Sequence, residues 1–165
     1  MASKKKSNPN SKYWKRKADK LWAEIIRSIG YCFVCGTTKN LQAHHIVPKE
    51  REELRWDLNN GVCLCATHHR WCRIISAHQG SFIFYYYFVK RFPSWANALH
   101  RKLLGGVVRH SYQEEYNELM AYKEAGDWRR FINRQLRTLA TGQKILLSNE
   151  GFWIVDEIWK ERGVL

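Results

Sequence analysis

The sequence predicts a fold in which helices flank a short central segment held together by a metal ion. Cysteines and histidines gather between residues 31 and 72, and apolar side chains recur at helical spacing before and after that segment. With 165 residues, 45% of them hydrophobic, the chain is long enough for one compact domain. We expect three regions: a basic arm and helix (1–30), a metal-binding core (31–80) and a helical C-terminal region (81–165).

The chain carries a large excess of positive charge. Its 28 Lys and Arg against 15 Asp and Glu give a formal net charge of +13. Such a charge favours a polyanionic partner, with nucleic acid expected ahead of an anionic membrane surface. No apolar run reaches the roughly 18 residues that span a bilayer, and no apolar signal core follows the basic start. We therefore expect a cytoplasmic protein without a membrane partner.

Several helices are expected from apolar periodicity and from capping residues at their ends. The expected helices cover residues 11–29, 81–92, 94–105, a segment that starts at Ser111, a segment that starts after Asp127, and 152–163. Residues 81–92 are so aromatic that period alone does not separate strand from helix, and a helix that ends before Pro93 is favoured. Ser111 and Glu114 have the spacing of a capping box.

Two ligand pairs in the central segment predict a tetrahedral zinc site of the Cys3His type. The pairs are Cys32 and Cys35 in "YCFVCG", and Cys65 and His68 in "LCATHH". Two residues between ligands allow a tight turn to direct both side chains at one ion, so zinc binding and folding would be coupled. The alternative is a set of ordinary buried thiols. Cys63 and Cys72 lie outside the pairs and are expected to be buried apolar residues or free thiols.

With His68 assigned to zinc, four polar residues of the segment remain without a structural role: His44, His45, Asn60 and His69. The strings "HHIVP", "NNGVCLC" and "HHRWC", flanked by CxxC and CxxH, resemble the HNH endonuclease family, especially its small phage-type or homing-like members. The resemblance implies a ββα-metal core, and therefore an α+β fold class. In that fold two short strands carry "QAHHIVP" and "NGVCLC", a helix starts near Thr67, and residues 59–61 form a loop that faces the active site.

The resemblance also implies a role for each of these residues. His45 matches the general base, Asn60 the residue that orients the base, and His44 and His69 the ligands of a catalytic divalent ion, Mg²⁺, Mn²⁺ or another. A neutral imidazole near pH 7 can take a proton from water, and a divalent ion stabilises charge that develops on a phosphate. The implied reaction is hydrolysis of DNA to 5′-phosphate and 3′-hydroxyl ends. Without the resemblance, the Asn-Gly pair at Asn60 would be interpreted as an ordinary turn.

Two positions depart from the family pattern. His68 stands where a zinc-binding cysteine is usual, a replacement that zinc accepts. Family members with a third catalytic-metal ligand carry a histidine one helical turn after the His69 position, where this chain has Arg73, which could instead bind a phosphate oxygen. We expect a two-histidine site completed by water and phosphate. His78 is the alternative third ligand if the helix breaks near Ile75 or Ser76.

Neighbouring strand residues point to opposite faces, so His44 and His45 can share one site only where the strand ends or bulges. Pro48 is consistent with a strand end at this point.

Double-stranded DNA is the expected partner, and basic side chains outside the catalytic residues would contact its phosphates. The candidates are Lys4, Lys5, Lys6, Lys12, Lys15, Arg16, Lys17, Arg70, Arg73, Arg129, Arg130 and Arg134, with Arg137 nearby. Tyr13 and Trp14 could stack on bases, although burial is more common for Trp. The oligomeric state is open, with a monomer slightly favoured. The alternative function is a zinc-stabilised nucleic-acid-binding module without catalysis.

Overall fold

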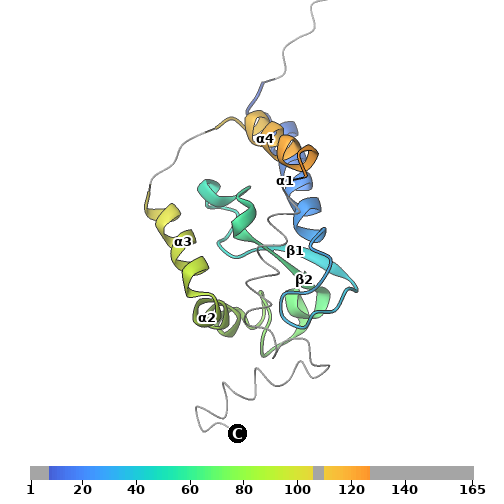
Figure 1. The fold of residues 1–165 in the computed structure, drawn as a ribbon, viewed down its shortest axis with the longest axis vertical. Helices are drawn as coiled ribbons and strands as arrows, with labels where there is room; N and C mark the ends of the chain where they lie inside the picture. Colours follow the sequence, from blue (N-terminus) through green and yellow to red (C-terminus); the bar gives the residue numbers. More distant parts are fainter. Residues whose placement is uncertain (1–7, 106–109, 127–165) are drawn as a thin grey trace, which may run out of the picture.

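A computed structural model describes residues 8–105 and 110–126 (Figure 1). In chain order the elements are α1 (Lys12–Arg27), β1 (Leu41–His45), the short helical turns η1 (Glu52–Leu54) and η2 (Leu58–Asn60), β2 (Gly61–Cys65), the helical turn η3 (Thr67–Trp71), α2 (Ser81–Arg91), α3 (Pro93–Leu104) and α4 (Tyr112–Glu124). The α+β class with a two-stranded core is confirmed. The helices expected after Asp127 and at 152–163 lie outside the described residues.

The described helices follow the sequence signals that predicted them. α1 buries the apolar face that includes Leu21, Trp22 and Ile26. The aromatic segment 81–91 is a helix rather than a strand. At the start of α4 the Ser111 hydroxyl accepts from the Glu114 N–H and the Glu114 carboxylate accepts from Ser111, which completes the expected capping box. No helix among the described residues has both the length and the apolar composition needed to cross a membrane.

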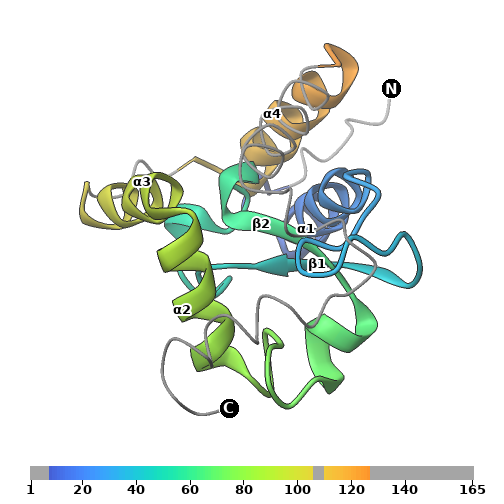
Figure 2. The same ribbon diagram turned by 60° about the horizontal axis from the view of Figure 1, so that its bottom comes forward.

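The two strands form an antiparallel hairpin at the centre of the molecule, with α1 on one side and α2 and α3 on the other (Figures 1 and 2). Both faces of β2 are buried. Val62 and Leu64 belong to the apolar cluster that contains residues of α2 and α3, whereas Cys63 belongs to the cluster that contains the apolar face of α1. The sheet is therefore the middle layer of the fold, and side-chain alternation sends neighbouring residues to different helices.

Gly61 begins β2 and pairs with His45 across the hairpin. Its backbone is extended, with φ −111°, and its N–H donates to the Leu58 carbonyl, so Asn60 lies in the helical turn η2 and Gly61 follows it as the first residue of the strand. A Cβ at this position would overlap the side chain of Ile26 and lie 2.8 Å from Trp22. Glycine is therefore required because α1 packs directly against the strand.

The chain after β2 folds back on itself instead of continuing as a helix. η3 ends at Trp71, and the Ala77 N–H donates to the His68 carbonyl at 2.9 Å. The buried Ser76 hydroxyl accepts from the N–H groups of Gln79 and Gly80, both at 3.1 Å. A Cβ on Gly80 would lie 2.5 Å from a backbone oxygen, so this return loop (residues 72–80) closes only with glycine there.

α4 packs against α1 at one end of the molecule (Figure 1). Lys123 of α4 and Glu24 of α1 form an exposed ion pair at 2.7 Å. The Gln113 N–H donates to the Pro9 carbonyl at 3.1 Å, so the residues that precede α1 are also attached to α4. Leu119 of α4 belongs to the same apolar cluster as α1 and Cys63 of β2, so α4 extends the core on the α1 side of the sheet.

Candidate active site and zinc centre

The four expected zinc ligands come together in the structure. Their ligand atoms all lie within 4.8 Å of one another. Cys35 Sγ lies 3.9 Å from Cys65 Sγ, and His68 Nδ1 lies 3.7 Å from Cys32 Sγ and 3.2 Å from Cys65 Sγ. Tetrahedral zinc with Zn–S bonds of about 2.3 Å requires ligand separations of roughly 3.5–3.8 Å. The cluster fits zinc.

Backbone geometry fixes each ligand pair. The Gly36 N–H donates to the Cys32 carbonyl at 2.8 Å, which closes the turn between the first two ligands. The Phe33 N–H donates to the Cys63 carbonyl at 2.7 Å and attaches this turn to β2. The hydrogen bond from the Cys32 thiol, followed by that from His68, lowers the pKa of Cys35 to about 4, so a thiolate is available to the ion.

A second group of possible ligands is formed by His44, His69 and His78, whose ligand atoms also lie within 4.8 Å of one another. Their ring centroids are 5.3, 5.3 and 4.8 Å apart in the three pairs. The return loop after η3 brings His78 beside His69. The structure therefore places three histidines together where the sequence favoured two, because the helix that would have turned His78 away ends at Trp71.

The three histidines suit a divalent ion chemically. Burial, with nearby imidazoles, lowers the pKa of His44 to about 3, and burial lowers the pKa of His69 to about 4. Both rings are therefore neutral near pH 7, as metal binding requires. His69 Nδ1 is buried without a hydrogen-bond partner, which is unusual for an imidazole nitrogen unless it serves as a ligand.

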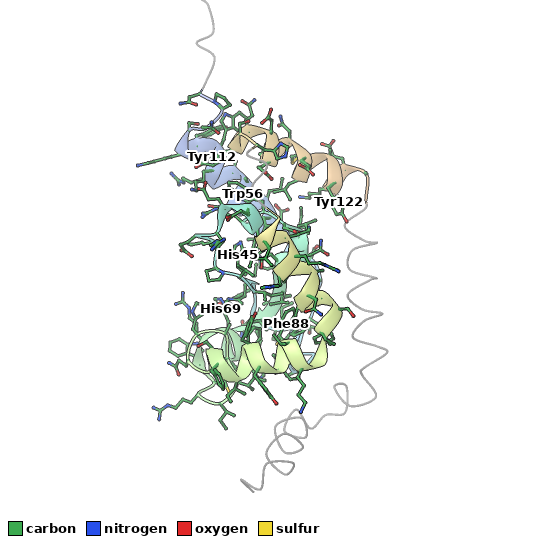
Figure 3. The ribbon with its side chains drawn as sticks, turned by 90° about the vertical axis from the view of Figure 1, so that its left-hand side faces the viewer. His45, Trp56, His69, Phe88, Tyr112 and Tyr122 are labelled. Atoms are coloured by element: carbon green, nitrogen blue, oxygen red, sulfur yellow. The ribbon has the colours of Figure 1, made fainter. Side chains whose placement is uncertain are left out.

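A groove of about 650 Å³ runs over this histidine group and over His45. Arg70 and Lys49 lie along it as basic residues, and Tyr85 of α2 adds an exposed aromatic wall. In Figure 3, His45 and His69 lie at the middle of the molecule, between the α4 end and α2. His44 and His45 share the groove because β1 ends at His45, as the sequence required.

His45 is held in a socket on the α1 side of the sheet. Its ring stacks on Trp22 with centroids 3.7 Å apart and planes 6° from parallel. Its Nε2 lies 2.8 Å from the carbonyl oxygen of Arg55. Because a carbonyl oxygen only accepts, Nε2 carries the proton in this bond, and the lone pair of the neutral ring is on Nδ1. Burial lowers the pKa of His45, which favours this neutral form.

Asn60 is completely buried in η2 and does not line the groove. Residues 59–61 were expected to form a loop that faces the site, but the Asn60 side chain is directed into the interior of the protein. Its Oδ1 accepts from the Val47 N–H at 2.7 Å, and its Nδ2 donates to the carbonyls of Val47 and Leu54 at 2.9 and 3.0 Å. Asn60 therefore fixes both ends of the chain segment from Val47 to Leu54. Its contact with His45 is indirect, through the neighbouring Arg55.

The basic residues expected to contact DNA fall into two sets in the described part of the chain, those with a partner and those that are exposed. Lys15 pairs with Glu52 at 2.6 Å, and Lys17 lies over the rings of Trp14 and Tyr116. The exposed candidates are Lys12, Arg16, Arg70 and Arg73. The others, Lys4, Lys5, Lys6, Arg129, Arg130, Arg134 and Arg137, lie outside the described residues.

The site also contains three residues that no sequence pattern indicated: Asp19, Trp22 and Arg55. Asp19 accepts two hydrogen bonds from the Arg55 guanidinium, both at 2.8 Å. Asp19 and Trp22 belong to a helix far from the histidines in sequence, and their spacing is that of any amphipathic helix. Only the packing of α1 on Gly61 brings them to His45.

The fold and site define a class: a ββα-metal core with a Cys3His zinc centre beside a group of histidines. Residues 32–72, about a quarter of the chain, match the family described as HNH endonuclease. The match supports a nuclease function in general. Comparisons with curated proteins and with solved structures gave no match.

Cysteines inside and outside the ligand cluster give a matched test of the zinc centre. Replacing Cys32 or Cys65 with Ser should release zinc and unfold the core, because structural zinc contributes on the order of 10 kcal/mol to folding in small zinc domains. Cys72→Ser is the control, since Cys72 is half-buried outside the cluster. Zinc content by mass spectrometry and thermal melting would measure both effects. Equal zinc content and melting temperature in Cys32→Ser and the wild type would contradict the assignment.

Proposed function

We propose that this protein is a metal-dependent endonuclease that hydrolyses double-stranded DNA to 5′-phosphate and 3′-hydroxyl ends, as a freestanding phage-type or homing-like enzyme. The observation that carries the proposal is the meeting of His44, His69 and His78 with His45 in one groove. Three histidines that can act as ligands and one oriented imidazole provide a metal site and a base within the same cavity.

His45 is the proposed general base. Its Nε2–H is engaged with the Arg55 carbonyl, so Nδ1 is the nitrogen that accepts a proton from water. The ring cannot rotate freely because Trp22 covers one face of it. Asn60 is a positioning residue in this scheme, since it holds the chain that ends at Arg55.

His44, His69 and His78 are the proposed ligands of a catalytic divalent ion, Mg²⁺, Mn²⁺ or another. When bound, such an ion stabilises negative charge on the phosphate and on the leaving oxygen. Arg70 lines the same groove and can hold a phosphate oxygen. The second ion, zinc, has a structural role only.

The alternative is a binding module without catalysis, suggested by Arg73 at the position of a third ligand. His78 lies close enough to His44 and His69 to supply that third ligand, which supports the nuclease over this alternative. The nuclease is therefore the function that the site supports best.

Replacing His45 with Ala should lower cleavage about 10²- to 10⁴-fold, because proton abstraction is lost. Zinc content and DNA affinity should be retained, since His45 belongs to neither ligand group. The measurement is conversion of supercoiled plasmid to nicked or linear forms with Mg²⁺ or Mn²⁺. A variant that cleaves at the wild-type rate would refute the assignment of the base.

His78→Ala should weaken binding of the catalytic ion and raise the concentration of Mn²⁺ that gives half-maximal cleavage, roughly tenfold or more by analogy with other losses of metal-site contacts. His100→Ala is the matched control, because His100 is an exposed histidine on α3 outside both ligand groups. Calorimetric titration of Mn²⁺ into the zinc-loaded protein supplies a second measurement. If both variants bind Mn²⁺ equally well, the site has only two protein ligands.

The exposed basic face of α1 should contribute to DNA affinity. Each phosphate contact adds about 0.9 to the slope of log affinity against log salt, so Lys12→Gln with Arg16→Gln should flatten the slope by up to about 1.8. Lys102→Gln with Lys123→Gln removes the same charge from lysines already paired with Asp57 and Glu24, and should leave the slope nearly unchanged. Fluorescence anisotropy in the His45→Ala background measures both. Equal slopes for the two double variants would show that only net charge matters.

A further inference from the structure

The segment that matches the HNH family begins at residue 32, whereas two side chains that support His45 belong to α1. Trp22 covers one face of the His45 ring. Asp19, one turn earlier on the same helix, lines the same groove and holds the residue whose carbonyl accepts from His45. The α1 helix is thus part of the site.

The contact from Asp19 to His45 runs through the Arg55 main chain. Arg55 donates from Nε and Nη2 to the two carboxylate oxygens of Asp19, both at 2.8 Å, and from Nη1 to the Lys49 carbonyl at 3.0 Å. The Arg55 side chain is only 11% exposed. Trp56 adds a hydrogen bond to Asp19 at 3.0 Å. The bidentate pair and the bond to Lys49 fix the guanidinium. The Arg55 N–H also donates to the Glu52 carbonyl at 3.3 Å, so the side chain and the main chain of Arg55 are both anchored.

The direction of the Arg55 carbonyl decides which nitrogen of His45 carries the proton. If the carbonyl turned away, the Trp22 stack would not favour Nε2–H over Nδ1–H, because it is the same for both tautomers. A ring protonated at Nδ1 cannot accept a proton there.

We propose that the Asp19–Arg55 ion pair is a positioning device for the catalytic histidine: it holds the Arg55 carbonyl against Nε2 and so keeps the His45 lone pair on Nδ1. The inference rests on the proposed role of His45 as base. Asp19 and Arg55 touch neither the substrate nor the catalytic ion in this scheme. They act only through His45.

The first test reads the tautomer directly. Nitrogen-15 spectra of the full-length, zinc-loaded protein at mildly alkaline pH should show His45 protonated at Nε2 in the wild type. Asp19→Asn removes one arm of the bidentate pair, and Arg55→Lys keeps the charge but loses the planar fork. Both should shift the His45 signals toward a mixture of tautomers. Glu24→Gln, which removes a carboxylate from the ion pair between α1 and α4, should leave the signals as in the wild type.

The second test is kinetic. Asp19→Asn and Arg55→Lys should each lower kcat roughly 10- to 100-fold, as loss of a supporting contact to an active-site imidazole commonly does. KM, DNA affinity and zinc content should be unchanged. The double variant should be no slower than the slower single variant, because the two residues act as one unit. Glu24→Gln should cleave at the wild-type rate.

The outcomes separate this inference from the proposed function. If Asp19→Asn and Arg55→Lys keep the wild-type tautomer and kcat while His45→Ala is inactive, the ion pair only attaches α1 and the inference is overturned. If the wild type does not cleave DNA, the proposed function fails, whereas the tautomer spectra still decide whether the pair orients His45. A fall in melting temperature without a tautomer shift also overturns the inference.

Discussion

The histidines of the groove take their positions from one constraint, the closure of the central segment by Cys32, Cys35, Cys65 and His68. These ligands join the turn after α1 to the end of β2, and the hairpin between them is closed as a result. His68 has two further consequences. Its carbonyl accepts from Ala77 and so anchors the return loop, and its neighbour His69 begins the second histidine group. A zinc ion at the first site would therefore fix the starting point of both η3 and the loop that carries His78.

The other half of the site depends on how closely α1 approaches the sheet. Gly61 permits the approach, and Trp22 and Asp19 then reach His45 and Arg55. Burial is the largest single effect and would raise the pKa of Asp19, but the hydrogen bonds and charge of Arg55, together with the hydrogen bond from Trp56, outweigh it. The pKa is lowered, so the carboxylate remains charged opposite the guanidinium. The matched segment contains His44, His45 and His69, His78 follows it in the return loop, and α1 completes the surroundings of the proposed base.

The sequence predicted those parts of the structure that depend on local spacing. The ligand pairs at Cys32–Cys35 and Cys65–His68, the strand end at His45 and the capping box at Ser111 all follow from short-range geometry. The sequence favoured a metal site without His78, because a helix that continued past Trp71 would turn His78 away. In the structure the buried Ser76 and Gly80 turn the chain back instead. Asp19 and Arg55 are 36 residues apart, and neither residue has a local pattern that predicts the pair.

Two pairs of adjacent histidines illustrate why short-range spacing in the sequence predicted much of this site. His44 and His45 are neighbours at the end of a strand, so alternation sends the first toward His69 and Phe84 and the second toward Trp22. His68 and His69 are neighbours in a helical turn, where a rotation of roughly 100° per residue separates the zinc site from the groove. In each pair the backbone alone assigns the two rings to different surroundings. One short segment can therefore hold the expected zinc ligands, possible ligands of a second ion and the proposed base without a long-range signal in its sequence. Asp19 and Trp22, in contrast, reach Arg55 and His45 only through the packing of α1.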